Sequence, residues 1–472
     1  FFSRMAAMPL VLDNGSHAIK AGLAGEKKPS LTLSSVVAES EKGTAEEKQL
    51  GRKKKKKKRY VCGHQALLQQ KELDLKLEYP IQRGLVHNME QTEALWMKCF
   101  RNYEVRPQET SLLLGLRPLT PKIDKQKIAQ MLFESIGVAG AYVSDHCLLA
   151  MYSLGRMNGV VMDIGHETTF ATTVLDGQSF VPSTVRCDIG GAHVSRYLAY
   201  LLSGKKKSAS LGKNAGVVTK SSSPSSSSLT SLLSPQALYT YDKIKEKHCF
   251  VADNFSNELK KASIYTASSS HSSSSSSSVS SSSTTRKIAL IGGGGGGGGG
   301  GSGATGGGPQ QQQQQSFRLP DGRQISVGGS IELCQAPEAL FVPSLLKPLG
   351  EVGLGGLEED DGGYGISRLL EMSIQKCPRA VRNELYQSML VCGGPSMLPG
   401  MQRRLQKEMI AVMPQSISSS SSKFRLHLPP HRRHSTFLGG SILASLPLFN
   451  QIKMKRSEYA ECGPSLVDRK CC

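Results

Sequence analysis

The chain of 472 residues is 38% hydrophobic and carries 58 Lys and Arg against 38 Asp and Glu, a net charge of +20. This length is enough for two or more hydrophobic cores. No run of about 18 apolar residues occurs, so no membrane-spanning helix is predicted. The 11 cysteines lack CxxC pairs and metal-ligand spacing, which is typical of free thiols in a reducing compartment. Phe1–Met8 does not resemble a secretory signal, and we expect a true start at Met5 or Met8 and an intracellular, soluble protein.

The first informative pattern is a short apolar strand, Leu10–Leu12, that runs into Asp13 and a glycine-rich turn. Gly15 permits a tight turn, and backbone N–H groups in such turns can bind anionic oxygens. Ser16 adds a hydroxyl donor, Lys20 adds a positive charge, and Asp13 can hold a hydrated Mg²⁺. The spacing matches neither GxxxxGK[ST] nor GxGxxG, so this segment alone leaves a phosphate cradle and a plain hairpin both open.

A strand-like stretch and then a dense run of charge follow this hairpin. Leu31–Ala38 has the apolar content of a short strand, and Glu39–Arg59 is first acidic and polar and then polybasic. The uninterrupted positive run Arg52–Arg59 is most often a solvated, disordered loop. The alternatives are a nuclear localisation signal or contact with an acidic partner, because dense positive charge attracts polyanions. No aromatic residue lies within the run, so base-specific nucleic-acid recognition is not predicted.

Helical apolar spacing follows and leads into a second copy of the strand–Asp–Gly pattern. Helices are expected at Thr92–Arg101, Lys122–Ile136 and Ser144–Gly155. In Asn158–Gly177 an apolar strand leads to Asp163, then to Gly165, a polar turn and another apolar strand. Two such hairpins in one chain predict duplicated halves that clamp one polyphosphate between them.

The rest of the chain alternates foldable segments with low-complexity inserts. The inserts Ser203–Pro235 and Thr266–Gln315 cannot bury enough apolar surface to fold and are predicted to be disordered. Helices are expected from about Ala192, within Ala237–Phe255 and over Arg368–Tyr386, and a hairpin within Ser316–Val327. Ser388–Met401 is an apolar strand broken by Gly393–Gly394, before a helical stretch at Gln402–Met413. Backbone at this break can lie against a base or a ribose, which would complete a nucleotide site.

These three elements, in this order, resemble the actin family. Segments similar to actins extend along most of the chain, at Tyr79–Trp96, Met151–Gly165, Lys243–Phe255, Pro337–Leu346 and Leu438–Cys472. The resemblance implies an α/β, actin-like ATPase fold. Two similar halves, each a mixed sheet with flanking helices, would then be joined by a hinge around a nucleotide cleft.

The resemblance also implies subdomains and two altered loops. The expected parts are an extension at 1–8, an outer large subdomain at 9–34, 79–153 and 436–472, an outer small subdomain at 35–78 with the polybasic loop, an inner large subdomain at 154–189 and 363–435, and an inner small subdomain at 190–362, with disordered inserts at about 203–235 and 266–315. In actins the region of Glu41–Arg59 inserts apolar residues into the next filament subunit, but here Leu50 is its only large apolar residue. Leu346–Tyr364, which corresponds to a loop between filament strands, carries the acidic cluster Glu358–Asp361. Both departures weaken the expectation of an ordinary filament.

A bound ATP or ADP with Mg²⁺ is the cofactor that the resemblance implies. The matching positions are Asp13, Gly15, Ser16, Lys20, Asp163, Gly165, Lys245, Glu246, Gly393, Gly394, Met397 and Arg433. Asp13 and Asp163 would hold Mg²⁺ through water, Met397 would pack against adenine, and Arg433 would flank the base. Asp242 stands where an arginine is usual in this family.

Several positions near the phosphates differ from actins. His146 stands where actins have the glutamine that positions the attacking water, and His166 and Phe170 replace an aspartate and a histidine. His17 replaces a glycine in the first turn, and Arg83 replaces a histidine near the phosphate site. Because phosphoryl transfer depends on positioning, we expect at most a weak ATPase. His146 is a candidate alternative base, or else a polar residue that only lines the cleft.

Two functions remain open at this point, and a third is disfavoured. The first is a divergent actin-like protein that binds ATP and acts in the cytoskeleton of the cytoplasm with other actin subunits and actin-binding proteins. The second is a non-polymerising, actin-related subunit of a nuclear chromatin-remodelling or histone-modifying complex, which the charged loop and the long inserts favour. A metabolic kinase of the same superfamily is disfavoured by the actin-like C-terminal segment.

Overall fold

The computed structural model of the chain describes residues 8–40, 59–73, 75–204, 234–261, 315–318, 322, 324–327, 331–350, 365–418 and 424–471. Most of the basic run, most of both inserts and the acidic part of the 346–364 loop lie outside the described residues. The interpretations of those segments therefore stay predictions.

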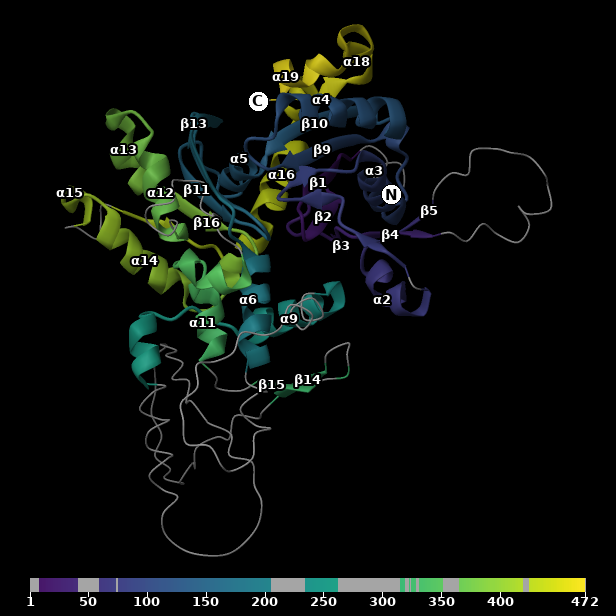
Figure 1. Cartoon of the computed structure of the whole chain (residues 1–472). Helices are drawn as coiled ribbons and strands as arrows, with labels where there is room; N and C mark the ends of the chain where they lie inside the picture. Colours follow the sequence, from purple (N-terminus) through teal and green to yellow (C-terminus); the bar gives the residue numbers. More distant parts are fainter. Residues whose placement is uncertain are drawn as a thin grey trace, which may run out of the picture.

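Two mixed sheets form the frame of the molecule (Figure 1). The six-stranded sheet has the order β18 (Met454–Lys455), β10 (Gly140–Asp145), β9 (Ser111–Leu116), β1 (Leu10–Asn14), β2 (Ala18–Leu23) and β3 (Leu31–Ser34). The five-stranded sheet has the order β13 (Gln178–Cys187), β12 (Thr169–Leu175), β11 (Gly159–Ile164), β16 (Met389–Cys392) and β17 (Leu426–His427).

The two sheets repeat one topology. β1 pairs antiparallel with β2 and parallel with β9, and β11 pairs antiparallel with β12 and parallel with β16. The central strands β1, β9 and β16 are buried along their whole length, as expected for apolar runs covered on both faces. The expected duplicated halves and the α/β fold class are confirmed.

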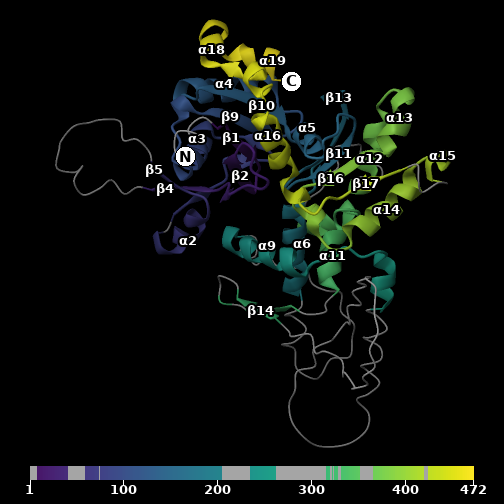
Figure 2. The same ribbon diagram turned by 180° about the vertical axis from the view of Figure 1, so that it is seen from behind.

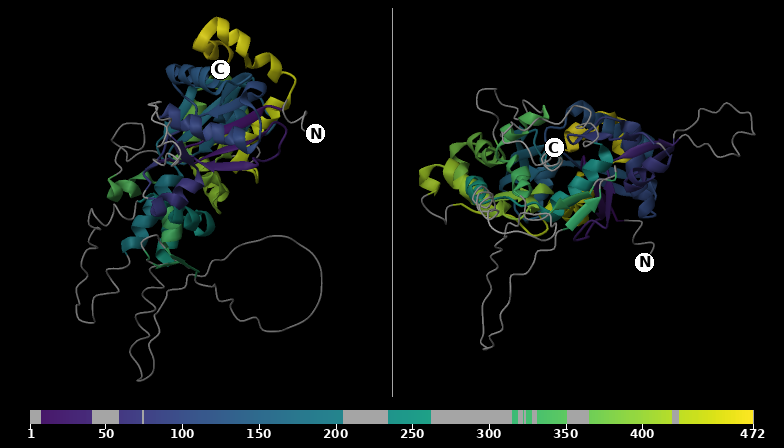
Figure 3. Two further views of the ribbon diagram at one scale, coloured as in Figure 1. Left: turned by 90° about the vertical axis from the view of Figure 1, so that its right-hand side faces the viewer. Right: turned by 60° about the horizontal axis from the view of Figure 1, so that its bottom comes forward.

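The half that contains β1, called here the outer half, is covered by helices near both chain ends. They are α3 (Met89–Asn102), α4 (Lys122–Gln130), a π-helical turn at Met131–Ile136, α18 (Arg456–Cys462) and α19 (Leu466–Lys470). Trp96 on α3 is fully buried, and its indole N–H donates to the Asn14 side chain at 3.0 Å. This bond holds the end of β1, where the first turn begins. Figure 3 shows α18 and α19 at one extreme of the molecule.

The inner half packs its helices in two groups (Figure 2). Beside the sheet lie α12 (Ile366–Gln375), α13 (Arg379–Tyr386), α14 (Met401–Val412) and α15 (Gln415–Ser418), and below it lie α6 (Gly191–Gly204), α9 (Pro235–His248) and α11 (Glu332–Glu338). The helical stretch expected over Arg368–Tyr386 is confirmed as two helices, because the first ends at Gln375 and the second starts after Pro378. Proline cannot donate the backbone hydrogen bond that would continue the first helix.

Small sheets complete the outer half. One contains β4 (Val37–Ser40), β5 (Arg59–Cys62) and β6 (Leu77–Glu78), next to α2 (His64–Leu73), and a second pairs β7 (Ile81–Gln82) with β8 (Leu85–Val86). Leu31–Ala38 was expected to be one strand, and this was wrong: the chain leaves β3 at Ser34 and enters a different sheet at Val37. The expected hairpin in Ser316–Val327 is confirmed by β14 (Gln315–Arg318) and β15 (Gln324–Val327).

Two helices lie between the large sheets: α5 (His146–Tyr152) and α16 (Ser435–Ser445), with α17 (Phe449–Ile452) following. They cross at Gly439, where an added Cβ would lie 1.6 Å from the Leu149 carbonyl oxygen. Only glycine permits this approach. Within the described residues, no helix combines the length and the apolar content that a bilayer span requires.

Candidate functional site

A cleft of about 430 Å³ lies between the two halves, and both Asp–Gly hairpins open onto it. It brings together every site residue expected from the sequence: Asp13, Gly15, Ser16, Lys20, His146, Asp163, Gly165, Lys245, Glu246, Gly393, Gly394, Met397 and Arg433. Residues far apart in the chain therefore converge on one cavity.

The hairpins present equivalent positions to the cleft. In the first, Asp13 on β1 lies opposite Lys20 on β2, and in the second, Asp163 on β11 lies opposite Phe170 on β12. Each aspartate comes at the end of a buried central strand, before its glycine turn. The first half thus carries a cation beside its aspartate, whereas the second half carries an aromatic ring at the matching place.

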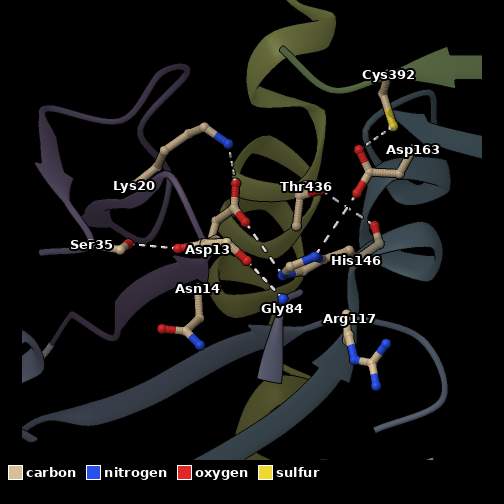
Figure 4. A network of polar contacts seen from close by, with 12 residues as sticks. Asp13, Asn14, Lys20, Ser35, Gly84, Arg117, His146, Asp163, Cys392 and Thr436 are labelled. Atoms are coloured by element: carbon tan, nitrogen blue, oxygen red, sulfur yellow. Dashed lines mark hydrogen bonds and ion pairs between the residues drawn. The ribbon is translucent and has the colours of Figure 1, made fainter. Parts of the chain in front are cut away.

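Asp13 is neutralised from its own hairpin. The Lys20 ammonium donates to Oδ2 at 2.6 Å, and His146 Nε2 lies 3.4 Å from Oδ1 (Figure 4). Burial acts to raise the pKa of Asp13, but the nearby Lys20 and His146 outweigh it and hold the pKa below its ordinary value. Asp13 is therefore a carboxylate that stays ionised.

Asp163 differs because it has no ammonium or guanidinium within ion-pair distance among the described residues. His146 Nδ1 lies 3.9 Å from Oδ2, and the Cys392 thiol donates weakly to Oδ1 at 3.8 Å. Burial raises the pKa of Asp163, and His146 only partly opposes this. A buried carboxylate that lacks a strong cation is a suitable group for a hydrated divalent ion.

His146 is the link between these carboxylates. It is the first residue of α5, it is 7% exposed, and its ring lies between Asp13 and Asp163 in Figure 4. Asp145, just before it, caps the helix by accepting from the Leu148 N–H at 2.7 Å. The Nε2 atom of His146 has no hydrogen-bond partner in the described structure.

The loop between β7 and β8 joins the two turns. The Gly84 N–H donates to Ser16 Oγ at 2.7 Å, and the Arg83 N–H donates to the Glu167 carboxylate at 2.5 Å. The Arg83 guanidinium also lies 3.5 Å from Asp188. Arg83 itself does not line the cleft, so its position differs from that expected. It bridges the halves instead, and the Ser16 hydroxyl keeps its own proton to donate.

Two imidazoles meet between the turns. The rings of His17 and His166 have centroids 4.7 Å apart. Burial among the walls of the cleft lowers the pKa of His166 well below its ordinary value, and the neighbouring His17 lowers it further. His166 is therefore neutral at pH 7 and can donate one N–H.

The opposite end of the cleft combines an apolar side chain with an ion pair. Met397 is 39% exposed there, and the Arg433 guanidinium lies 3.5 Å from the Glu246 carboxylate. Gly393 has φ +93°, and an added Cβ would lie 2.1 Å from the Ile164 carbonyl oxygen, so the strand must turn here at glycine. No atom lies within 4 Å of a Cβ built on Gly394, so this backbone faces open space.

Lys245 has an internal role that the sequence interpretation missed. Its ammonium donates to Asp242 at 2.6 Å, to Ser195 Oγ at 2.9 Å and to the Gly191 carbonyl oxygen at 2.9 Å. Burial acts to raise the pKa of Asp242, but the Lys245 charge outweighs it and lowers the pKa strongly. Asp242, which stands where an arginine is usual in this family, is therefore held as a carboxylate by the buried ion pair with Lys245.

The family model named Actin matches residues 5–472. The chain belongs to the actin family. The match covers nearly the whole chain, so the inserts interrupt one actin domain rather than separate several domains.

The residues of this actin-family cleft that were not predicted from the sequence include two arginines and a threonine. Arg117 follows β9 directly, Arg432 lies in the short turn before α16, and Thr436 donates to the His146 carbonyl oxygen at 3.4 Å. Burial lowers the pKa of Arg117 to about 10. No local motif marks these positions, although a lone arginine directly after an apolar strand end was a usable signal.

Proposed function

We propose that this cleft binds ATP with Mg²⁺, and that the protein is a structural, actin-like assembly component with slow ATP hydrolysis. One observation carries the proposal: two Asp–Gly hairpins from similar halves, and the Gly393–Gly394 turn, line one cavity. Family membership supports a bound nucleotide and divalent metal in general.

The phosphate end of the cleft offers suitable donors. The Ser16 hydroxyl, the Lys20 ammonium and the backbone of the two turns would hold phosphate oxygens. Asp163, a partly buried carboxylate without a strong cation, fits a Mg²⁺ ion held through water, with Asp13 on the other side. The ion, when bound, neutralises charge on the phosphate oxygens.

The other end suits a base and a ribose. Exposed backbone at Gly394 permits the close approach of a planar group, and Met397 supplies an apolar surface. Glu246 on α9 and Arg433 in the turn before α16 pair with each other at 3.5 Å and supply polar contacts at this end. Lys245 supports this wall through its bonds to Asp242 and Ser195 rather than as a free cation.

Slow hydrolysis follows from the groups around the terminal phosphate position. The Phe170 ring, 2% exposed, has no polar atom with which to order water. His146 retains a free Nε2, but both of its nitrogens face carboxylates at 3.4 and 3.9 Å. An imidazole placed in this way fixes the two aspartates better than it positions a water molecule.

Calorimetric titration of the full-length protein with Mg-ATP tests the binding. We expect saturable binding that weakens roughly tenfold or more in Lys20→Met, because a charge-assisted contact is lost. Lys28→Met, on the exposed surface of the same region, is the matched control and should bind like the wild type. Absence of binding by the wild type would refute the proposal.

The assembly role has two versions, and sedimentation with Mg-ATP separates them while phosphate release is measured in parallel. Pelleting that requires nucleotide and salt would support a cytoskeletal actin of the cytoplasm with other actin subunits as partners. Tight ATP binding without pelleting would support the non-polymerising nuclear subunit, which the basic run Arg52–Arg59 favours. Nuclear accumulation of a tagged protein that depends on this run would contradict the purely cytoskeletal version.

A further inference from the structure

Arg117 is a buried arginine whose charge is not matched inside the fold. It is 6% exposed, and its Nε and Nη1 have no hydrogen-bond partner. No ion pair joins it to any carboxylate among the described residues, and Figure 4 draws no contact line from it to the other residues shown. A guanidinium has five N–H donors, and burying it without acceptors is unfavourable.

Its place in the cleft is specific. The Arg117 Cζ lies 5.5 Å from the centre of the Phe170 ring. Phe170 is the residue opposite Asp163, at the position where the first hairpin has Lys20 opposite Asp13. Arg117 therefore places a positive charge, from the end of β9, against the aromatic residue that stands at the Lys20 position of the second hairpin.

Neighbouring groups leave this charge available. The side chain of Arg117 packs beneath Gly84, where an added Cβ would lie 2.8 Å from Arg117 Cδ. The nearby carboxylate of Asp188 is already bound by Arg186, at 2.5 Å, and by Arg83, at 3.5 Å. The missing partner of Arg117 is therefore an anion that enters the cleft.

We propose that Arg117 binds the terminal phosphate of a nucleoside triphosphate, and so makes the cleft prefer the triphosphate over the diphosphate. This inference rests on the proposed nucleotide binding. A planar guanidinium pairs with two phosphate oxygens at once, which an ammonium such as Lys20 cannot do. Arg117 would thus distinguish the two nucleotides, whereas Lys20 would serve both.

Arg432 supplies a matched control, because it is a cleft arginine with a purely internal role. Its Nε and Nη2 donate to the Ser396 carbonyl oxygen at 3.2 and 3.0 Å, and its Nη1 donates to the Pro429 carbonyl oxygen at 3.2 Å. Its removal should destabilise the loop that it holds and leave the preference between nucleotides unchanged.

The test measures the affinities of the full-length protein for Mg-ADP and for the Mg complex of the non-hydrolysable β,γ-imido analogue of ATP. Arg117→Met should weaken the analogue roughly tenfold or more and change ADP by less than about twofold, since a charge-assisted contact is lost from one ligand only. Arg117→Lys should fall between, and Arg432→Met should keep the wild-type ratio.

Thermal unfolding without nucleotide provides the second readout. Arg117→Met should raise the melting temperature, because it removes an unmatched buried charge, whereas Arg432→Met should lower it. Equal weakening of both nucleotides by Arg117→Met, or a lower melting temperature with an unchanged ratio, would show that Arg117 is only structural. A wild-type protein that binds neither nucleotide would instead refute nucleotide binding itself, before any variant is compared.

Discussion

The crossing of α5 and α16 yields the sharpest prediction about stability. In Gly439→Ala the new methyl group would lie 1.6 Å from the Leu149 carbonyl oxygen and 3.1 Å from the Ser153 nitrogen. Both atoms belong to the backbone, so relief requires that the two helices separate. Because α5 begins with His146, this separation would also move the ring that lies between Asp13 and Asp163.

The expected cost follows from the kind of atom that must move. Overpacking a core costs about 1–3 kcal/mol when side chains can adjust, so a clash with backbone should reach about 3 kcal/mol or more. In the neighbouring Gly440→Ala, the methyl group would lie 3.0 Å from the Leu113 and Val11 side-chain methyls. These can shift, and the better helix propensity of alanine, worth up to about 1 kcal/mol, offsets the strain.

Urea unfolding of both variants, followed by circular dichroism without nucleotide, measures this difference. We expect Gly439→Ala to lose about 3 kcal/mol or more and Gly440→Ala to stay within about 1 kcal/mol of the wild type. Gly439→Ala should also bind Mg-ATP more weakly. Equal stabilities for the two variants would refute the account of this crossing.

Three further predictions concern charges around the cleft. Burial raises the pKa of Asp163 above its ordinary 3.8, so folding stability falls as the pH rises from that value through the raised pKa. Asp163→Asn should flatten this fall in urea unfolding over a series of pH values from about 4 upward, while it abolishes Mg²⁺-dependent ATP binding. Asp242→Asn should cost about 3–5 kcal/mol in the same unfolding assay, because buried Lys245 loses its partner, and adding Lys245→Met should recover part of that loss. Glu167→Ala removes the acceptor of the Arg83 N–H, and release of a fluorescent nucleotide should accelerate roughly 2- to 10-fold; an unchanged rate would contradict the bridge between the turns.

Local patterns explain why the two hairpins could be predicted from the sequence. An apolar strand that ends in Asp and Gly is written in consecutive residues, and its repetition at Asp13 and Asp163 indicated duplicated halves. The helices at 92–101 and 122–136 were found for the same reason, because their apolar spacing is local. The convergence of distant site residues on one cleft could be predicted only because the family resemblance supplied the long-range arrangement.

Features that depend on tertiary contacts were missed. The break within Leu31–Ala38 is made by Ser35, whose N–H donates to the His17 carbonyl oxygen and whose hydroxyl donates to that of Gly15. The burial of Arg117 depends on Gly84 above it and on Phe170 beside it, and neither is near it in sequence. The ion pair between Lys245 and Asp242 was also missed, although it could have been predicted, because the two residues lie three positions apart on one helix.

The most direct test of the central proposal is hydrogen–deuterium exchange of the full-length protein with and without Mg-ATP. If the nucleotide lies between the two halves, backbone amides of both turns, at 14–18 and 164–168, and of the Gly393–Gly394 turn should become protected together. Protection should be lost when Mg²⁺ is chelated. Protection of one half alone, or of neither, would contradict a nucleotide clamped between the two hairpins.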